Sequence, residues 1–245
     1  MIQEVDKDSR RSYHINQVKK LEKSIRGSEY SYARNYKAAF VPYPMPPLGK
    51  MDSGIMTISR FKADSSKRVS LPVSFTWPVR TVNLKRCLLV SRTKVEGTDK
   101  ELVYINLHLE AYDKGAGKKA QTRALNRILK KEASKGNYVI AAGDFNQTFN
   151  NVDINEYKVR KGLWKPGIID ISDYDSSLNF VMDSATPTCR SLDRPLKGAD
   201  KSKFQYYVID GIVYSSNIEM FYCKTIDIGF RNSDHNPVVA EIKLK

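Results

Sequence analysis

Long apolar runs are absent from this sequence. No segment reaches transmembrane length, and no basic segment is followed by the apolar core of a secretion signal. Internal repeats, low-complexity tracts and long Gly/Ser linkers are also missing. We therefore expect a soluble chain that forms a single domain over residues 1–245. The compartment stays open, because an anchor before residue 1 would bring the protein to a membrane.

Cysteine is scarce as well. Cys87, Cys189 and Cys223 are scattered along the chain, are odd in number and form no CxxC spacing. The sequence therefore indicates neither a zinc site nor a disulfide framework.

Acidic residues are in the minority. The chain has 41 Lys and Arg residues against 27 Asp and Glu residues, which gives a net charge of +14. This imbalance favours an anionic partner such as nucleic acid, a phosphorylated small molecule or an anionic membrane surface, and a generally basic surface is the simpler alternative. No protein partner is indicated. Hydrophobic residues make up 41% and aromatic residues 10% of the chain, enough for a sizeable core.

Hydrophobic periodicity predicts two helices and several strands. Four apolar residues have helical spacing: Ile15, Val18, Leu21 and Ile25. Asp8 or Ser9 is available as the N-cap of that helix, and residues 120–133 form a second amphipathic helix that ends before Gly136. Strands are expected at 54–59, 88–92, 102–110, 138–146, 206–215 and 237–244. The polar stretch 183–203 is predicted to be a surface loop, and loops of this length often cover a site.

Polar residues with catalytic potential lie at the ends of these strands. In "YVIAAGDFNQ" the apolar run ends in Asp144 and Asn146, which project to the same side of an extended backbone. Together they can hold a water molecule and a phosphoryl oxygen, although a capping Asp followed by a turn Asn is a common alternative.

Two of the three histidines lie beside acidic motifs. In "RNSDHNPVVAEI", His235 is a natural proton acceptor and Asp234 can orient it or bind a cation, while an ordinary turn with an exposed histidine is the alternative. Asp210 is a lone carboxylate in the apolar segment "YVIDGIVY", which is costly unless it is paired. A histidine is the obvious partner. His108 shares one strand face with Tyr104 and Asn106, and a satisfied core histidine is the usual explanation for such a position.

Taken in order, the segments "QEVD", "SGIMTISRF", "NLHLE", "GDFNQ", "YVIDGIVYS" and "SDHNPV" resemble the endonuclease/exonuclease/phosphatase superfamily of DNase I-like hydrolases. The resemblance covers nearly the whole chain. It implies an α/β fold: a four-layer, two-sheet sandwich with helices outside. His108 is similar to the histidine of the branch that includes DNase I.

The resemblance also implies a role for each motif residue. Glu4 would be a ligand of Mg²⁺ or Mn²⁺, with Asp234 near the metal. His235 would be the general base, and Asp210 would orient it. Asp144 and Asn146 would position water and phosphate, and His108 would stabilise charge on the phosphoryl oxygens. Asn146 and His108 would thus also bind the substrate.

The sequence departs from the family pattern at its beginning. Family members carry a first core strand with an asparagine, and a helix leading to the "QE" strand, before the glutamate; neither precedes Glu4 here. Glu4 is therefore either a solvated charge at a frayed end or the family glutamate in a chain truncated at its N-terminus. The second interpretation predicts an uncovered sheet edge beside Glu4, weak metal binding and a tendency to dimerise or aggregate.

The function expected from the sequence is metal-dependent hydrolysis of a phosphodiester or phosphomonoester, with nucleic acid favoured by the charge. The aromatic segment "YSYARNYKAAFVPYPMPP" leaves a phospholipid or sugar-phosphate substrate as an alternative, through a loop over the head group. A catalytically impaired binding module of the same fold is the second alternative.

Overall fold

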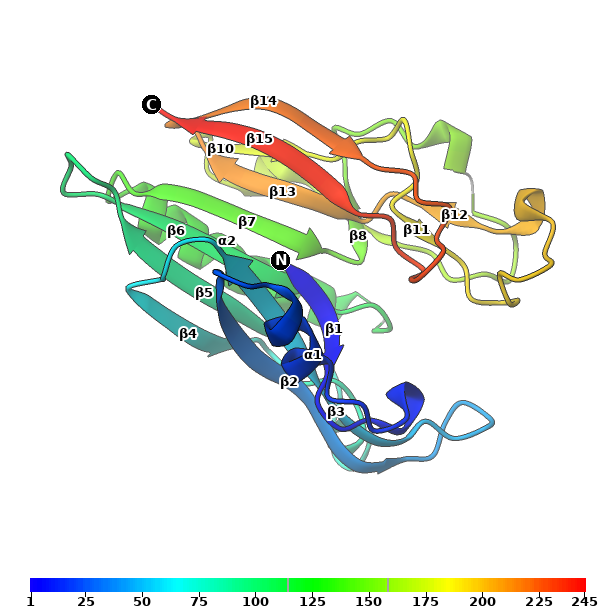
Figure 1. Cartoon of the computed structure of the whole chain (residues 1–245). Helices are drawn as coiled ribbons and strands as arrows, with labels where there is room; N and C mark the ends of the chain where they lie inside the picture. The colour runs from blue at the N-terminus through cyan, green and yellow to red at the C-terminus, as the bar shows by residue number, and fades with distance from the viewer. Residues whose placement is uncertain (114, 158) are drawn as a thin grey trace.

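The computed structural model describes residues 1–113, 115–157 and 159–245, and its main element is a six-stranded sheet. The sheet order is β10-β13-β7-β6-β5-β4, in which β6 and β7 are parallel and the other neighbours antiparallel (Figure 1). The strands are β10 (Leu178–Val181), β13 (Asp210–Ser215), β7 (Tyr138–Asp144), β6 (Glu101–His108), β5 (Cys87–Lys94) and β4 (Ser65–Ser70).

A second β layer faces this sheet and consists of two separate parts. One part has the order β1-β3-β2, with β1 (Ile2–Asp6), β3 (Gly49–Ser59) and β2 (Glu29–Val41). The other part is the antiparallel pair β14 (Ile218–Thr225) and β15 (Val238–Leu244). Among the described strands, β1 pairs with β3 alone and β15 with β14 alone. β1 and β15 therefore each keep one edge free of strand partners.

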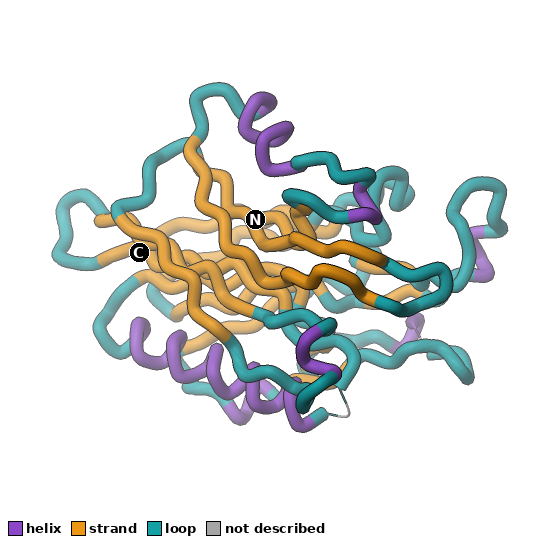
Figure 2. Tube along the Cα trace, turned by 90° about the horizontal axis from the view of Figure 1, so that it is seen from below, coloured by secondary structure: helices purple, strands orange, loops and turns teal. Residues whose placement is uncertain are grey.

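One helix lies on the outer face of the six-stranded sheet and another on the outer face of the three-stranded part, on opposite sides of the strands (Figure 2). α1 (Gln17–Ser24) packs Val18 and Leu21 against the outer face of the three-stranded part. α2 (Ala116–Ala133) packs Leu125 and Leu129 against the six-stranded sheet. The four-layer sandwich with helices outside, expected from the sequence, is thereby confirmed.

Three local expectations differ from the structure. The N-cap of α1 is Asn16, whose side chain accepts a hydrogen bond from Lys19 N, and not Asp8 or Ser9; a 3-10 turn at Arg10–Ser12 separates the helix from β1. The segment 183–203 is mostly loop but contains β11 (Cys189–Arg190), which pairs with β12 (Tyr206–Tyr207). The aromatic segment 30–47 is largely strand β2, and only its proline-rich end forms a loop.

The remaining elements are short. β8 (Gln147–Phe149) and β9 (Gly167–Ile169) form a two-stranded parallel pair. The other 3-10 turns are Val79–Thr81, Asn155–Tyr157, Ile171–Asp173 and Lys201–Lys203. Within the described ranges, none of the helices combines the length and apolar composition needed to cross a membrane.

A buried asparagine joins the two β layers near the start of the chain. Asn106 on β6 is completely buried; it accepts a hydrogen bond from Gln3 Nε2 at 2.8 Å and donates to Met56 O at 2.9 Å and Ile2 O at 3.3 Å. An amide buried in this way needs such partners, because an unpaired polar group inside a protein is costly. These bonds hold β1 over β6 and so determine where Glu4 lies.

Candidate active site

Three polar side chains lie in one row across the six-stranded sheet. His108 is the register partner of Asp144, and Asp144 is the register partner of Asp210, on the adjacent strands β6, β7 and β13. Each lies at the end of its strand that faces the site, with exposures of only 4%, 5% and 9%. The sheet itself therefore places one histidine and two carboxylates side by side, although they are far apart in the sequence.

Asp144 is held from two sides. His108 Nε2 lies 3.2 Å from Asp144 Oδ2, and Asn146 donates to Asp144 through its backbone N at 2.7 Å and through Nδ2 at 3.0 Å. Burial disfavours the carboxylate, but the hydrogen bond and charge of His108 hold the pKa of Asp144 below its usual value. The sequence predicts that the two side chains project from an extended backbone. Asn146 instead has a φ of 52°, so they meet through a tight turn.

Asp210 and His235 form a close pair. His235 Nδ1 lies 2.7 Å from Asp210 Oδ2, as the sequence predicts for a buried carboxylate with a histidine partner. Thr188 Oγ1 accepts from the backbone N of Asp210 at 3.2 Å and fixes this end of β13. Burial disfavours the imidazolium, but the Asp210 carboxylate raises the pKa of His235 well above its ordinary value.

Glu4 approaches this row from the second β layer. It lies at an irregularity of β1 between Ile2 and Val5, with a φ of 56°, and its side chain is 51% exposed. Its Oε1 is 4.0 Å from His108 Nε2, and Arg11 forms an ion pair with its other oxygen. Partial desolvation alone would raise the pKa of Glu4, but the charges of Arg11 and His108 lower it to about 2. Glu4 is thus an ordered carboxylate beside the row and not a frayed terminal charge.

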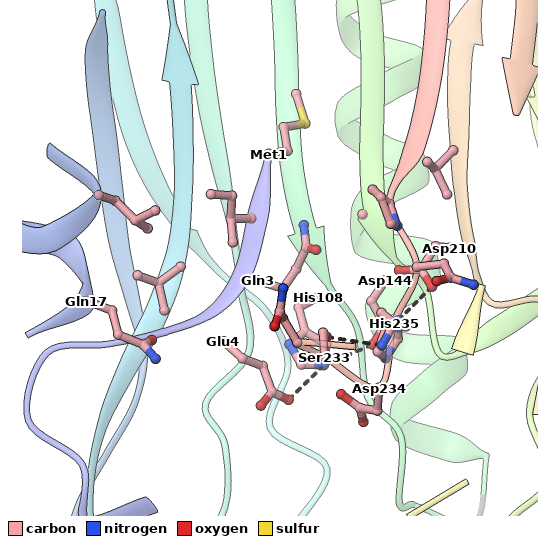
Figure 3. A pocket seen from close by; sticks show the side chains of 18 of the residues that line it. Met1, Gln3, Glu4, Gln17, His108, Asp144, Asp210, Ser233, Asp234 and His235 are labelled. Carbon is pink, nitrogen blue, oxygen red and sulfur yellow. Dashed lines mark hydrogen bonds and ion pairs between the residues drawn. The ribbon is translucent and has the colours of Figure 1, made fainter. Parts of the chain in front are cut away.

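These residues open onto one groove of about 1380 Å³. Its wall includes the site residues Glu4, His108, Asp144, Asp210, Asp234 and His235. Figure 3 shows the carboxylates of Glu4 and Asp234 at the same end of this groove as His235. Six of the seven expected site residues therefore converge. The seventh, Asn146, is buried behind Asp144, where it also donates to Leu109 O at 3.0 Å, and it is not part of the groove wall.

Beyond the site, the groove runs between β1 and β15. Its floor is the inner face of β7 and β13, where Ile140, Ala142 and Ile212 lie, and Val238 and Ala240 of β15 form one side. The free edge of β1 forms the other side. The sequence predicts such an uncovered sheet edge beside Glu4. Part of that edge is satisfied locally, because Asp6 N donates to Gln17 Oε1 at 2.8 Å.

Several residues around the site gave no signal in the sequence. Arg11 bridges Glu4 and the buried Asp6, with a distance of 3.0 Å from Nη2 to Asp6 Oδ1. Arg86 is 2% exposed, its Nε and Nη1 have no hydrogen-bond partner among the described residues, and its charge helps to lower the pKa of Glu4. Cys189 lies beside His235 through an isolated backbone bridge. No sequence motif marks these two arginines as neighbours of Glu4, because only the folded chain brings them there.

The matched family model is the endonuclease/exonuclease/phosphatase family, over residues 1–235. The chain belongs to this family. Members of the family are hydrolases of phosphoesters, which agrees with the class of activity expected from the motifs. The family also accounts for the DNase I-like form of the two-sheet sandwich. No curated protein matches the sequence significantly.

Solved structures with the same fold are distant in sequence. An endonuclease/exonuclease/phosphatase from Beutenbergia cavernae DSM 12333 is 18% identical, with a TM-score of 0.60 over 88% of this chain and 53% of that one. The human Nocturnin catalytic domain with bound sulfate is 14% identical, with a TM-score of 0.60 over 94% and 77%. D. rerio TDP2 with a single-strand DNA product is 16% identical, with a TM-score of 0.56 over 93% and 81%. The chain thus spans about half the length of the Beutenbergia cavernae protein.

Proposed function

We propose that this family member is a Mg²⁺- or Mn²⁺-dependent hydrolase of phosphoester bonds in nucleic acid. The observation that carries the proposal is the convergence of two histidines and four carboxylates at one end of one groove. Such a set offers a base, cation ligands and donors to a phosphoryl group within a small space.

His235 has the role of general base in this proposal. Because Asp210 accepts a hydrogen bond from Nδ1–H, Nε2 of the neutral ring has a free lone pair and takes the proton of the attacking water. The water oxygen forms the new bond to phosphorus, the bond to the leaving oxygen breaks, and the leaving oxygen takes a proton from solvent. From Nε2, the ring nitrogen that lies beside Asp144 and Glu4, His108 donates to a non-bridging oxygen, where negative charge grows in the transition state. Asp144, fixed by Asn146, orients His108 and the water.

The residues present fit a hard divalent cation. Glu4 and Asp234 supply carboxylate oxygens to the same end of the groove, and oxygen ligands are those preferred by Mg²⁺. The low pKa of Glu4 keeps that ligand ionised throughout the physiological range. A bound cation would supply positive charge to the phosphoryl oxygens. The ion pair with Arg11 already offsets part of the negative charge of Glu4, so we expect Glu4 to bind the metal weakly.

Nucleic acid is supported as the substrate by charge and by one aromatic side chain. The net charge of +14 suits a polyanion. Tyr112 is 70% exposed and follows His108 by four residues, just after the end of β6; partial desolvation together with the charges of Glu4, Asp144 and Asp234 raises its pKa. An exposed tyrosine at that place is a suitable surface for stacking a base. The D. rerio TDP2 structure holds a DNA product on the same fold.

A phospholipid or sugar-phosphate diester is the second candidate. The proline-rich end of segment 30–47 exposes large apolar side chains, among them Phe40, Tyr43 and Met45. Apolar side chains on a loop can insert among lipid chains or contact a sugar face.

The test is hydrolysis of four substrates with and without Mg²⁺: plasmid DNA, sphingomyelin, phosphoinositides and a generic phosphodiester. We expect cleavage of DNA that depends on the metal and is lost in His235→Ala. His14→Ala is the matched control, because His14 is exposed and pairs only with Asp8 among the described residues. Cleavage of lipid alone would select the second candidate. Binding of DNA without hydrolysis would indicate an impaired binding module.

A further inference from the structure

A cysteine lies at the candidate base, although the family motifs do not include it. Cys189 on β11 forms an isolated backbone bridge with His235, and Arg190 N donates to Asp234 O at 2.9 Å. These contacts bring three side chains together. One ligand atom each from Cys189, Asp234 and His235 lies within 4.8 Å of the other two.

The donor set differs in kind from that around Glu4. A thiolate, an imidazole and a carboxylate are the ligands of zinc, whereas Mg²⁺ prefers oxygen alone. In a tetrahedral zinc site neighbouring ligand atoms lie roughly 3.4–3.8 Å apart, as follows from the usual metal–ligand lengths. The three groups therefore need only modest closing movements to share one ion. A water molecule would complete the four ligands.

Access and orientation also suit a cation. Asp234 and His235 line the groove, so an ion can enter from solvent, while the buried Cys189 lies behind them. The Asp210 carboxylate at His235 Nδ1 repeats the arrangement in which a carboxylate orients a metal-binding histidine through its other nitrogen. The second coordination layer is thus already in place.

We propose that Cys189, Asp234 and His235 form a Zn²⁺ site that switches the hydrolase off. The thiol releases its proton to solvent as the Zn–S bond forms. His235 then donates its lone pair to zinc and has none for a water proton. The binding site stands on geometry alone, but its inhibitory effect rests on the proposed function. Asp234 belongs to both ligand sets, so Zn²⁺ at Cys189 would also withdraw a carboxylate from Mg²⁺ at Glu4, and the two cations would have opposite effects on one active site.

Binding is tested first by equilibrium dialysis of the whole chain against ZnCl₂, without substrate. We expect one Zn²⁺ per chain, bound at least about tenfold more weakly by Cys189→Ser, since even outer-shell changes cost 10–100-fold. Serine keeps a donor for Arg190 O, the partner of the Cys189 thiol at 3.5 Å. Cys223→Ser is the matched control, because Cys223 lies on β14 outside the cluster. Equal Zn²⁺ affinity in wild type and Cys189→Ser would overturn the proposal.

A second measurement does not depend on how the variant folds. Wild-type protein loaded with Co²⁺ should show thiolate-to-cobalt charge-transfer absorption, and its absence would also overturn the site. Inhibition is then measured by adding Zn²⁺ to the Mg²⁺-dependent reaction. We expect inhibition of the wild type and relief in Cys189→Ser. If zinc binds as expected but no phosphoester is hydrolysed, the proposed function fails and the zinc site stands.

Discussion

The Nδ1 atom of His235 lies 2.7 Å from Oδ2 of Asp210, and this contact joins the loop before β15 to the end of β13. It determines which ring nitrogen faces the groove. It also links the candidate base to the row of His108, Asp144 and Asp210, because Asp210 is the register partner of Asp144. The histidine is thus oriented by the same sheet that places the other polar groups.

Replacing Asp210 tests this contact. Asp210→Asn should lower kcat by about 10³–10⁴-fold, because the amide no longer favours the tautomer with Nε2 free. The carboxylate raises the pKa of His235, and the base works only when neutral, so activity should rise with pH through a midpoint above the ordinary value for histidine. In the variant that midpoint should move to lower pH. A pH–rate profile measures both effects, with Asp99→Asn, an exposed loop carboxylate, as control. An unmoved midpoint would contradict the pairing.

His108 is expected to act on the phosphoryl group. His108→Gln should lower kcat by about 10²–10³-fold with a smaller change in KM, as for loss of a donor that acts mainly in the transition state. Steady-state kinetics check this, and His14→Gln is the control on an exposed histidine. If KM rises while kcat stays constant, His108 binds the substrate but does not stabilise charge in the transition state.

Glu4 is expected to hold the divalent cation. Glu4→Gln keeps the shape of the side chain but removes its charge, and should weaken Mg²⁺ binding at least about tenfold. Calorimetric titration with Mg²⁺ measures the affinity. Asp8→Asn is the matched control, since Asp8 lies four residues away and pairs with Lys50 and His14 outside the groove. Equal affinities for all three proteins would exclude Glu4 as a ligand.

The buried amide of Asn106 should matter for stability. Asn106→Leu removes the acceptor of Gln3 Nε2 and one donor to each of the carbonyls of Ile2 and Met56, which should cost about 1–3 kcal/mol in the free energy of unfolding. Urea denaturation at constant m-value measures the change. Asn179→Leu on β10 is the control, because that side chain is exposed in the same sheet and should change stability little.

The free edges of β1 and β15 should favour association between copies. Unpaired strand edges beside an apolar floor are templates for pairing with another chain. We expect sedimentation velocity to show species larger than the monomer as concentration rises. Ala240→Lys places a charge on the β15 side of the groove and should suppress them, whereas Glu241→Lys on the exposed face should not. A monomer at all concentrations would mean that the edges are protected by side chains.

Motif order and strand periodicity predicted the sandwich and six converging residues because most of the motifs lie where a strand begins or ends. Caps and turns were harder to predict from the sequence, since asparagine and serine are equally favourable N-caps and nothing distinguishes Asn16 from Ser9 before folding. It also could not show that Asn146 turns back onto Asp144, or that Arg11 and Cys189 reach the site. Those contacts depend on loops between distant strands, where no periodic pattern exists.

The one-sided pairing of β1 has a consequence for motion. Its amides depend on β3 and a few side chains, whereas β6 is bonded on both sides within its sheet. Hydrogen exchange should therefore be faster in β1 than in β6, through local opening that leaves the rest folded. Each opening would carry Glu4 away from His108 and dismantle the site. A cation bound to Glu4 would slow that exchange by mass action, so protection of β1 would report occupancy of the site directly.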